Sequence, residues 1–169
     1  MDGEPGPVSG AAGQGLRAPV RPRTDVIGRI EKLVAGVGID IIEVDRIRRA
    51  IGRWGQRFLE RVYTSGEIGY CQAQARPEIS FAARFAAKEA AMKALGRGPK
   101  GGVRWKSLEV VNRPSGAPVI RPGPRLQQLL GKRVLLISLT HTHRQAMATA
   151  LLIDKADEDR SEDCFPADR

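Results

Sequence analysis

Two acidic residues stand in segments of the chain that are otherwise apolar. Asp40 interrupts the run Val37-Gly38-Ile39-Asp40-Ile41-Ile42, which is typical of a buried strand. Glu89, preceded by Lys88, lies in the alanine-rich segment 81–96, which has the composition of a helix. A buried carboxylate is costly unless it is paired, hydrogen-bonded or bound to a metal. The two acids therefore indicate a site, and we expect a divalent cation there.

The charged residues of segment 81–96 fall close to its apolar stripe. At about 100° per residue, Lys88 lies within the stripe, with Arg84 at one edge and Glu89 at the other. Lys93 lies just beyond Glu89. A purely structural interpretation is an amphipathic helix whose charged ends reach solvent, with Asp40 capping a turn. The functional interpretation is one polar pocket, in which the carboxylates hold Mg²⁺ and the basic residues attract a phosphate-bearing ligand.

Two glycines and two histidines are further candidates. Gly96 and Gly98 follow the helix and would let a ligand approach the backbone closely. Alternation places His141 and His143 on one face of the apolar segment 133–140. A zinc site is disfavoured, because it needs four ligands and only two distant cysteines remain. A backbone-bonded histidine and a ligand-contacting His141 both stay open.

The charge balance narrows the class of partner. The chain has 169 residues and a net charge of +9. Its last sixteen residues, from Asp154, carry a net −4, so the rest carries +13. This excess favours a nucleic acid, a phosphate-rich cofactor or an acidic protein as partner. The chain has no Walker phosphate loop, which disfavours a nucleotide hydrolase.

The ends of the chain differ from its middle. Residues 1–30 are rich in Gly, Pro and Arg, and residues 155–169 are acidic; we expect both to be disordered. Residues 31–154 then form one domain. No apolar run approaches the roughly 20 residues that span a bilayer, so no membrane partner is expected. No secretory signal is evident, and two cysteines do not suggest a disulfide framework, so a cytoplasmic location is expected.

The middle of the chain alternates between strand and helix patterns. Gly36 and Gly38 in the first strand would allow another backbone to approach. Thr64 and Glu67 form a capping box, Pro77 is expected to end that helix, and Ser80 to cap the next. The expected strands are 33–42, 108–112, 117–120, 133–140 and 146–153. The second and third are expected to form a hairpin, and the last two an antiparallel pair. A helix or turn is expected over 43–51, and helices over 57–62, 65–75, 81–95 and 126–130, with Gly96 ending the helix 81–95.

Three motifs resemble the holo-acyl-carrier-protein synthase family, the short type of 4′-phosphopantetheinyl transferase. They are Gly38-Ile39-Asp40-Ile41 with Glu43 and Arg46-Ile47, then Arg84-Phe85-Ala86-Ala87-Lys88-Glu89-Ala90 with Lys93-Ala94-Leu95-Gly96, and finally Ser138-Leu139-Thr140-His141-Thr142. The resemblance runs from about residue 36 to residue 153. It implies an α+β fold, with a small antiparallel sheet packed around a long central helix. It also implies a homotrimer with active sites between subunits.

The resemblance assigns a role to each candidate residue. Asp40 and Glu89 would bind Mg²⁺, and Lys93 would act with them in catalysis. Coenzyme A phosphates or adenosine would contact a second set of residues. That set is Arg84, Lys93, Gly96, Gly98, Pro118 and His141.

The implied reaction moves phosphopantetheine from coenzyme A to a serine of apo acyl carrier protein, releasing 3′,5′-ADP, in fatty acid biosynthesis. Acyl carrier proteins are acidic, so Arg46, with Arg48, Arg49 and Arg53, would form a docking face. No nucleic acid takes part in this interpretation. The alternative is a non-catalytic, basic nucleic-acid-binding module, which would have no need for Asp40 and Glu89.

Overall fold

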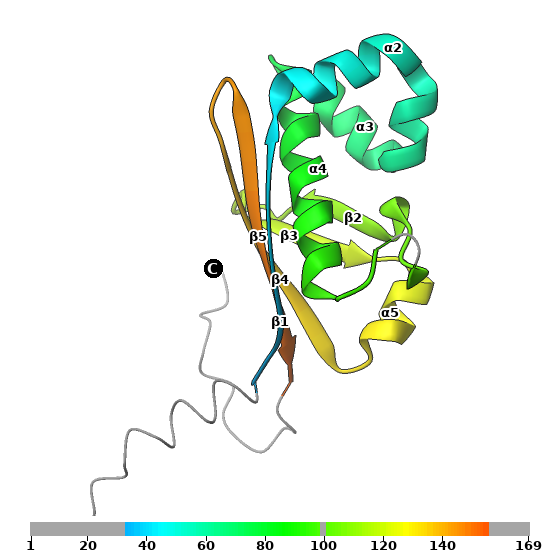
Figure 1. The fold of residues 1–169 in the computed structure, drawn as a ribbon, viewed down its shortest axis with the longest axis vertical. Helices are drawn as coiled ribbons and strands as arrows, with labels where there is room; N and C mark the ends of the chain where they lie inside the picture. The colour runs from blue at the N-terminus through cyan, green and yellow to red at the C-terminus, as the bar shows by residue number, and fades with distance from the viewer. Residues whose placement is uncertain (1–32, 99–100, 156–169) are drawn as a thin grey trace, which may run out of the picture.

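The computed structural model describes residues 33–98 and 101–155. A long helix, α4, has a three-stranded sheet on one side and helices α2 and α3 on the other (Figure 1). The expected α+β fold with small antiparallel sheets is confirmed. The expected extension 1–30, and the expected tail beyond Lys155, lie outside the described residues. The elements are β1 (Val34–Glu43), α2 (Val44–Val62), α3 (Ser65–Gln72), α4 (Pro77–Ala94), η2 (Trp105–Ser107), β2 (Leu108–Asn112), β3 (Pro118–Pro122), α5 (Pro124–Leu130), β4 (Arg133–His141) and β5 (Gln145–Asp154).

The larger sheet has the order β1-β5-β4 and is antiparallel throughout. The predicted pairing of β4 with β5 is therefore confirmed, as is the β2–β3 hairpin. One face of the sheet packs on α4. The other face leaves Val37, Ile39 and Ile41 of β1 between 56% and 64% exposed, with Leu136 and Leu151 beside them. Alternation along β1 turns Asp40 toward α4.

Two glycines bring β1 and α4 into backbone contact. A Cβ placed on Gly36 would lie 2.0 Å from the carbonyl oxygen of Ala94, and one on Gly38 would lie 2.0 Å from that of Ala90. No side chain fits in either gap. The predicted close approach of another backbone is confirmed, and its partner is the central helix.

The central helix begins four residues earlier than the sequence predicts. Pro77, predicted to end the preceding helix, occupies the first turn of α4, and α3 has already ended at Gln72. Proline suits this position because the first turn needs no amide donor. At the other end Gly96, at φ 61°, follows the cap residue Leu95 and ends the helix as predicted.

Helix α2 consists of two helical segments that meet at Gly55, whose φ of 52° and ψ of −136° are not helical. The predicted break between helical pieces at 43–51 and 57–62 is therefore confirmed, and Gly55 lies between them. Glycine adopts this conformation without the clash of a Cβ. Trp54, 53% exposed, and Phe58 lie beside the kink with ring centroids 6.4 Å apart.

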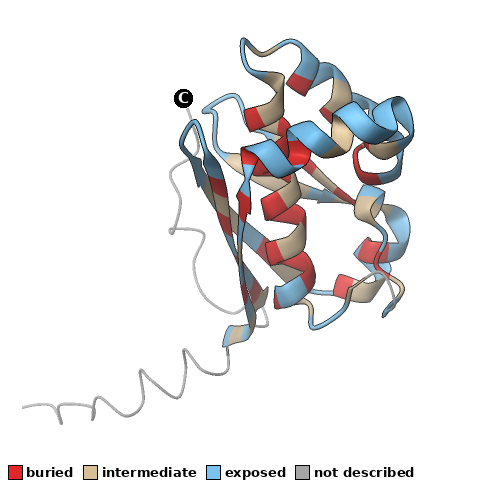
Figure 2. Cartoon of the chain, turned by 45° about the horizontal axis from the view of Figure 1, so that its top comes forward, coloured by how far each residue is buried: buried red, intermediate tan, exposed pale blue. Residues whose placement is uncertain are grey.

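A buried ion pair ties α3 to α4. Lys88 Nζ donates to Glu67 Oε2 at 2.8 Å and to the carbonyl oxygen of Trp105 at 2.9 Å, and both charged side chains are fully buried. Glu67 also accepts from the amides of Val110 and Thr64, which confirms the predicted capping box. Figure 2 shows the buried residues concentrated along α4. Lys88 is therefore a core residue, and its predicted place in a phosphate pocket is wrong.

Among the described helices, none combines the length and the apolar character needed to cross a membrane.

Candidate active site

The contact between β1 and α4 places Asp40 beside Lys93. Lys93 Nζ donates to Asp40 Oδ1 and to the carbonyl oxygen of Ile39, both at 2.8 Å. The Asp40 side chain is 16% exposed, whereas that of Lys93 is 51% exposed. The lysine thus holds a largely buried carboxylate while its ammonium group stays open to solvent.

Glu89 lies one turn before Lys93 on α4 and is half-buried. Burial raises the pKa of the Glu89 carboxyl, and the negative charge of Asp40 raises it further, whereas Lys93 and Arg46 act in the opposite direction. The two carboxylates are thus near enough to repel one another. Sequence reasoning placed Arg46 on a docking face only; the structure also brings its charge to Glu89.

This group of residues fits a hard divalent cation. A cation between two carboxylates removes the repulsion that raises the pKa of Glu89. The described residues contain no group of three or more His, Cys, Asp and Glu side chains able to hold a metal by themselves. Mg²⁺ suits such a site because it commonly binds one or two carboxylates together with water and substrate phosphate.

Arg84 lies on a different face of α4. Its guanidinium group stacks on the Tyr70 ring at 4.0 Å, and Nη2 donates to Asn112 Oδ1 at 3.4 Å. Arg84 Nε is buried and has no partner among the described residues. Within one chain, Arg84 therefore does not join the cluster of Asp40 and Glu89. Pro118 lies on the Arg84 side, because it pairs with Asn112 in the β2–β3 hairpin.

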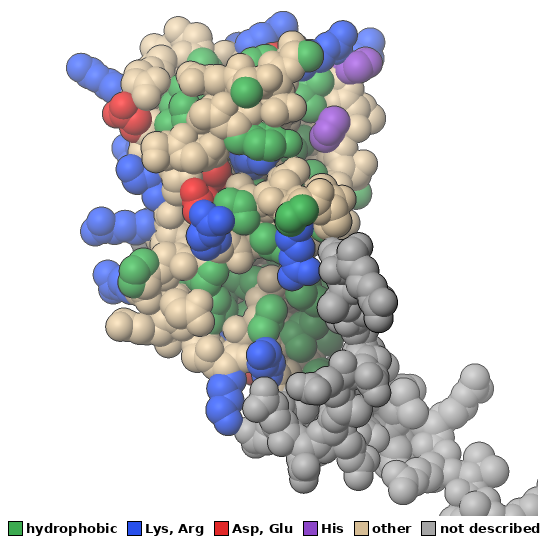
Figure 3. Space-filling view, turned by 180° about the vertical axis from the view of Figure 1, so that it is seen from behind, with side chains coloured by type: hydrophobic (Ala, Val, Ile, Leu, Met, Phe, Trp, Pro, Cys, Tyr) green, Lys and Arg blue, Asp and Glu red, His purple; other side chains and the backbone are tan. Residues whose placement is uncertain are grey.

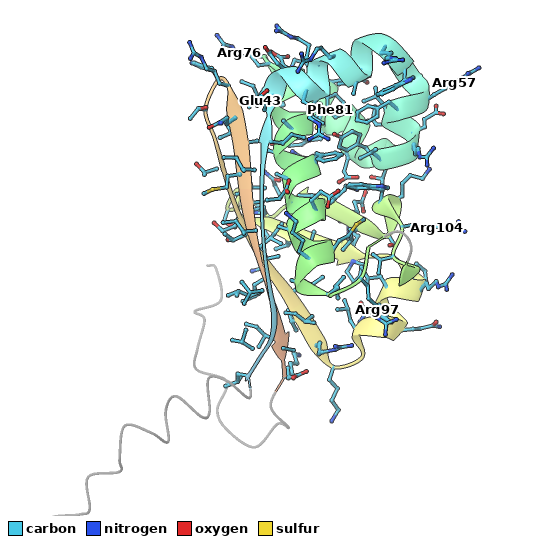
Figure 4. All side chains as sticks on the ribbon, viewed as in Figure 1. Glu43, Arg57, Arg76, Phe81, Arg97 and Arg104 are labelled. Atoms are coloured by element: carbon cyan, nitrogen blue, oxygen red, sulfur yellow. The ribbon has the colours of Figure 1, made fainter. Side chains whose placement is uncertain are left out.

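His141 lines a separate hollow of about 670 Å³ between the β4–β5 turn, the end of α3 and the start of α4. Arg76 lies in the wall of this hollow and donates from Nη1 to His143 Nδ1 at 2.7 Å. Figure 3 shows both histidines at the surface, and Figure 4 places Arg76 at this end of the molecule. His143 belongs to the β4–β5 turn, which Thr142 Oγ1 stabilises, so the prediction that it continues the strand face of His141 is wrong, whereas its place between the two expected strands is confirmed. Nothing in the sequence singled out Arg76 except its place before a proline.

The predicted docking arginines divide between two environments. Arg46, Arg49 and Arg53 line a hollow of about 410 Å³, together with the Phe58 ring. Arg48 instead pairs with Asp45 at 2.6 Å, and both side chains are exposed.

The same hollow reaches the candidate centre through Phe85, one turn before Glu89 on α4. An adjoining hollow, also of about 410 Å³, shares Trp54, Phe58 and Phe85 and adds Arg57 and Arg61. The sequence reasoning missed these aromatic walls. Their signal was the spacing of Trp54 and Phe58, one turn apart in an arginine-rich helix.

Gly96 and Gly98 follow the end of α4. The Gly96 amide donates to the carbonyl oxygen of Lys93 at 3.0 Å, so the chain turns directly after the cluster. Within the described residues, Asp40, Glu89, Lys93 and Arg46 thus form one centre. The remaining predicted ligand contacts, Arg84, Pro118 and His141, lie elsewhere on the subunit.

Comparison with known proteins gives a consistent result. The sequence model of the 4′-phosphopantetheinyl transferase superfamily matches residues 36–151. The holo-[acyl-carrier-protein] synthase of Koribacter versatilis is 48% identical over 125 residues, which cover 72% of this chain and 100% of that relative. The crystal structure of holo-[acyl-carrier-protein] synthase from Neisseria meningitidis matches with a TM-score of 0.67 at 30% identity, covering 71% of this chain and 98% of that one.

A second solved structure carries a ligand. Holo-[acyl-carrier-protein] synthase from Helicobacter pylori, in complex with coenzyme A, matches with a TM-score of 0.63 at 29% identity, covering 69% of this chain and 98% of that one.

Proposed function

Because the chain belongs to the 4′-phosphopantetheinyl transferase superfamily, we propose that Asp40, Glu89 and Lys93 form its transfer centre. The chain transfers the 4′-phosphopantetheine group from coenzyme A to a serine of apo acyl carrier protein and releases 3′,5′-ADP. The alternative of a nucleic-acid-binding module finds no support in these comparisons. The observation that carries the assignment is the contact of Lys93 with Asp40 beside a Glu89 of raised pKa.

The charges at this centre suit phosphoryl transfer. The serine oxygen forms a bond to the phosphorus that bears the pantetheine arm, and the bond from that phosphorus to the 3′,5′-ADP oxygen breaks. Lys93 stabilises the negative charge on the pyrophosphate. Glu89 accepts the serine proton, directly or through a water. Mg²⁺, held by Asp40 and Glu89, supplies further positive charge against that pyrophosphate when bound.

We assign the rest of coenzyme A to the residues on the other faces of the subunit. The His141 hollow is large enough for part of a nucleotide and has Arg76 in its wall. Arg84, with an unpartnered buried Nε, and Pro118 lie near the β2–β3 hairpin. Since these groups lie apart from Asp40 within one chain, they are best used if a neighbouring subunit supplies them.

A homotrimer with active sites between subunits accounts for the exposed face of the sheet. Val37, Ile39, Ile41, Leu136 and Leu151 form a continuous apolar face on β1, β5 and β4. Contiguous exposed apolar surface of this kind is typical of an interface. A second copy of the chain is the partner that also completes the coenzyme A contacts.

The acidic carrier protein would dock on α2. Arg46, Arg49 and Arg53 rim an apolar hollow that leads to Glu89, so a helix bound there would present its serine to the centre. A role in fatty acid biosynthesis and a cytoplasmic location complete the proposal.

The deciding test is intact mass spectrometry of apo acyl carrier protein after incubation with this protein, coenzyme A and Mg²⁺. We expect the carrier to gain the mass of one phosphopantetheine group. EDTA and Glu89→Gln should each abolish the gain, whereas Arg113→Gln, an exposed arginine of the β2–β3 turn, should not. A gain that persists with Glu89→Gln would overturn the assignment of the centre.

A further inference from the structure

A hollow of about 150 Å³ gathers three arginines from three segments of the chain. Arg97 follows α4, Arg104 lies in the loop before η2, and Arg125 belongs to α5. Among the described residues that line the hollow, none is acidic. Figure 4 places Arg97 and Arg104 on the same side of the molecule, near α5.

The three guanidinium groups have no counter-ions in the described part of the chain. Within residues 33–98 and 101–155, none of them forms an ion pair or a side-chain hydrogen bond. Arg121, by contrast, pairs with Glu109 at 3.1 Å. Like charges in one hollow repel one another, and that repulsion is relieved when an anion binds between them.

Two glycines allow the arginines to converge. A Cβ on Gly101 would lie 3.1 Å from Arg97 Cβ, and a Cβ on Gly102, at φ 88°, would lie 3.5 Å from Arg125 Nη2. Arg97 and Arg125 therefore lie against the same dipeptide, in which a side chain on Gly101 would crowd Arg97 and the φ of Gly102 favours glycine.

Hydrogen bonds connect the segment that carries Arg104 to helix α5. The amide and the hydroxyl of Ser107 donate to the carbonyl oxygen of Arg104, at 3.0 and 2.6 Å. The amide of Gly123, the cap residue of α5, donates to the carbonyl oxygen of Ser107 at 2.8 Å. These hydrogen bonds hold the backbone that carries Arg104 and Arg125 in place before a ligand binds, which lowers the entropy cost of binding.

We propose that this hollow binds a single phosphate group, either free phosphate or the phosphomonoester end of a small molecule. Guanidinium groups match phosphate oxygens with paired N–H donors. Val103, Leu126 and Leu129 add an apolar lining beside the three arginines, which are exposed and open to a ligand from solvent. The hollow is far smaller than the 670 Å³ hollow at His141, so it accepts one phosphate group and not a nucleotide. None of the residues assigned to the transfer reaction is used.

The test is a titration of the full chain with sodium phosphate at constant ionic strength, followed by NMR at the amide signals of Gly101 and Gly102. Arg125→Gln should raise the Kd for phosphate by about tenfold to a hundredfold, the range for losing a charged hydrogen bond. Arg125→Lys keeps the positive charge but loses the paired N–H donors of the guanidinium group, so it should raise the Kd by an intermediate amount. The matched control Arg113→Gln should leave the Kd unchanged. Circular dichroism of each variant checks that it is folded.

A parallel titration with 3′,5′-ADP separates the two sources of phosphate. If Arg125→Gln raises the Kd of both phosphate and 3′,5′-ADP, the hollow accepts a phosphate group of the nucleotide. If it raises only the Kd of free phosphate, free phosphate is the ligand. Either result supports the site. An equal Kd in wild type and Arg125→Gln would overturn it. An equal loss of phosphate affinity in Arg113→Gln would also overturn it. So would loss of the NMR response of Gly101 and Gly102 in Arg76→Gln, because the phosphate would then bind at the His141 hollow.

Discussion

Glu89 shows how much a single residue depends on its neighbours. The sequence identifies Glu89 and Asp40 as out of place in apolar segments, but the sequence does not show that their charges interact. Their coupling comes from the contact of two elements separated by some fifty residues. A carboxyl with a raised pKa beside the side chain of Asp40 is poised to bind a cation or to accept a proton.

Replacing the neighbours of Glu89 should shift its pKa in opposite directions. Asp40→Asn removes a negative charge and should lower the pKa of Glu89, whereas Lys93→Met removes a positive charge and should raise it. Carbon-13 NMR titration of the Glu89 side chain in metal-free protein measures both. Asp45→Asn, at an exposed acid of α2, is the control and should have no effect. An unchanged pKa in Asp40→Asn would show that the two carboxylates are not coupled.

The same raised pKa has a consequence for stability. The folded pKa of Glu89 lies above its unfolded value, so protonated Glu89 stabilises the fold. In metal-free protein this contribution is complete below the unfolded pKa and is lost as the pH rises through the folded pKa. Thermal unfolding of wild type and Glu89→Gln across this pH range should show a loss of stability in the wild type that the variant lacks.

Lys88 is the residue at which sequence and structure differ most. Helical periodicity placed it correctly within the apolar stripe, but a buried partner on α3 could not be read from one helix. Lys88→Met leaves the charge of Glu67 buried, and we expect a loss of about 3–5 kcal/mol in the free energy of unfolding, measured with urea. Lys88→Met combined with Glu67→Gln should cost less than the sum of the single changes.

Lys106→Met, at an exposed lysine in η2, is the control for Lys88→Met and should leave stability nearly unchanged. A loss of under about 1 kcal/mol in Lys88→Met, the size of an exposed ion pair, would contradict the prediction.

At the scale of elements, the site depends on the spacing between β1 and α4. Gly38→Ala must move the helix away from the strand, because its Cβ would meet the carbonyl oxygen of Ala90. We expect a loss of at least about 1–3 kcal/mol in stability, as in overpacked cores, together with weaker transfer activity. Urea unfolding and the carrier mass assay measure the two effects.

Gly52→Ala is the matched control for Gly38→Ala. Gly52 lies in helix α2 with no atom within 4 Å of an added Cβ, and alanine there should stabilise the protein by about 0.5–1 kcal/mol. If Gly38→Ala were as well tolerated as Gly52→Ala, the backbone contact would not control the site.

The sequence predicted most elements because their signals are local. The Thr64 capping box, the Gly96 stop and the β2–β3 turn each depend on a few neighbouring residues. The start of α4 was wrong because Pro77 can either end a helix or begin one. The break in α2 was predicted between residues 51 and 57, but not its exact place at Gly55, because glycine in a helical pattern does not reveal its own φ.

At the scale of the whole molecule, the sequence could not show the exposed apolar face or the distribution of the basic residues. The nearly continuous apolar run of β1 suggested a strand buried on both faces, whereas the structure covers only one of them. The arginines of α2 and those beside α5 likewise lie in separate hollows, which net charge cannot reveal.

Ile39→Glu tests the proposed trimer. A charge in the apolar face should prevent association, and light scattering should show a monomer where the wild type is a trimer. Transfer activity should also fall in Ile39→Glu, because the proposed active sites lie between subunits. Gln128→Glu adds the same charge on α5 and should leave the trimer intact. A trimeric Ile39→Glu would exclude this face as the interface.

Within residues 33–98 and 101–155, strand β1 has a paired neighbour on one side only, and it carries Asp40. Strands at the edge of a sheet open locally more easily than the rest of a fold. Each opening would separate Asp40 from Lys93 while the remainder of the subunit stays folded. The amides of β1 should therefore exchange with deuterium faster than those of β5, and ligands that bind across Asp40 and Glu89 should slow that exchange. Hydrogen exchange in this one strand then reports how fully the centre is assembled.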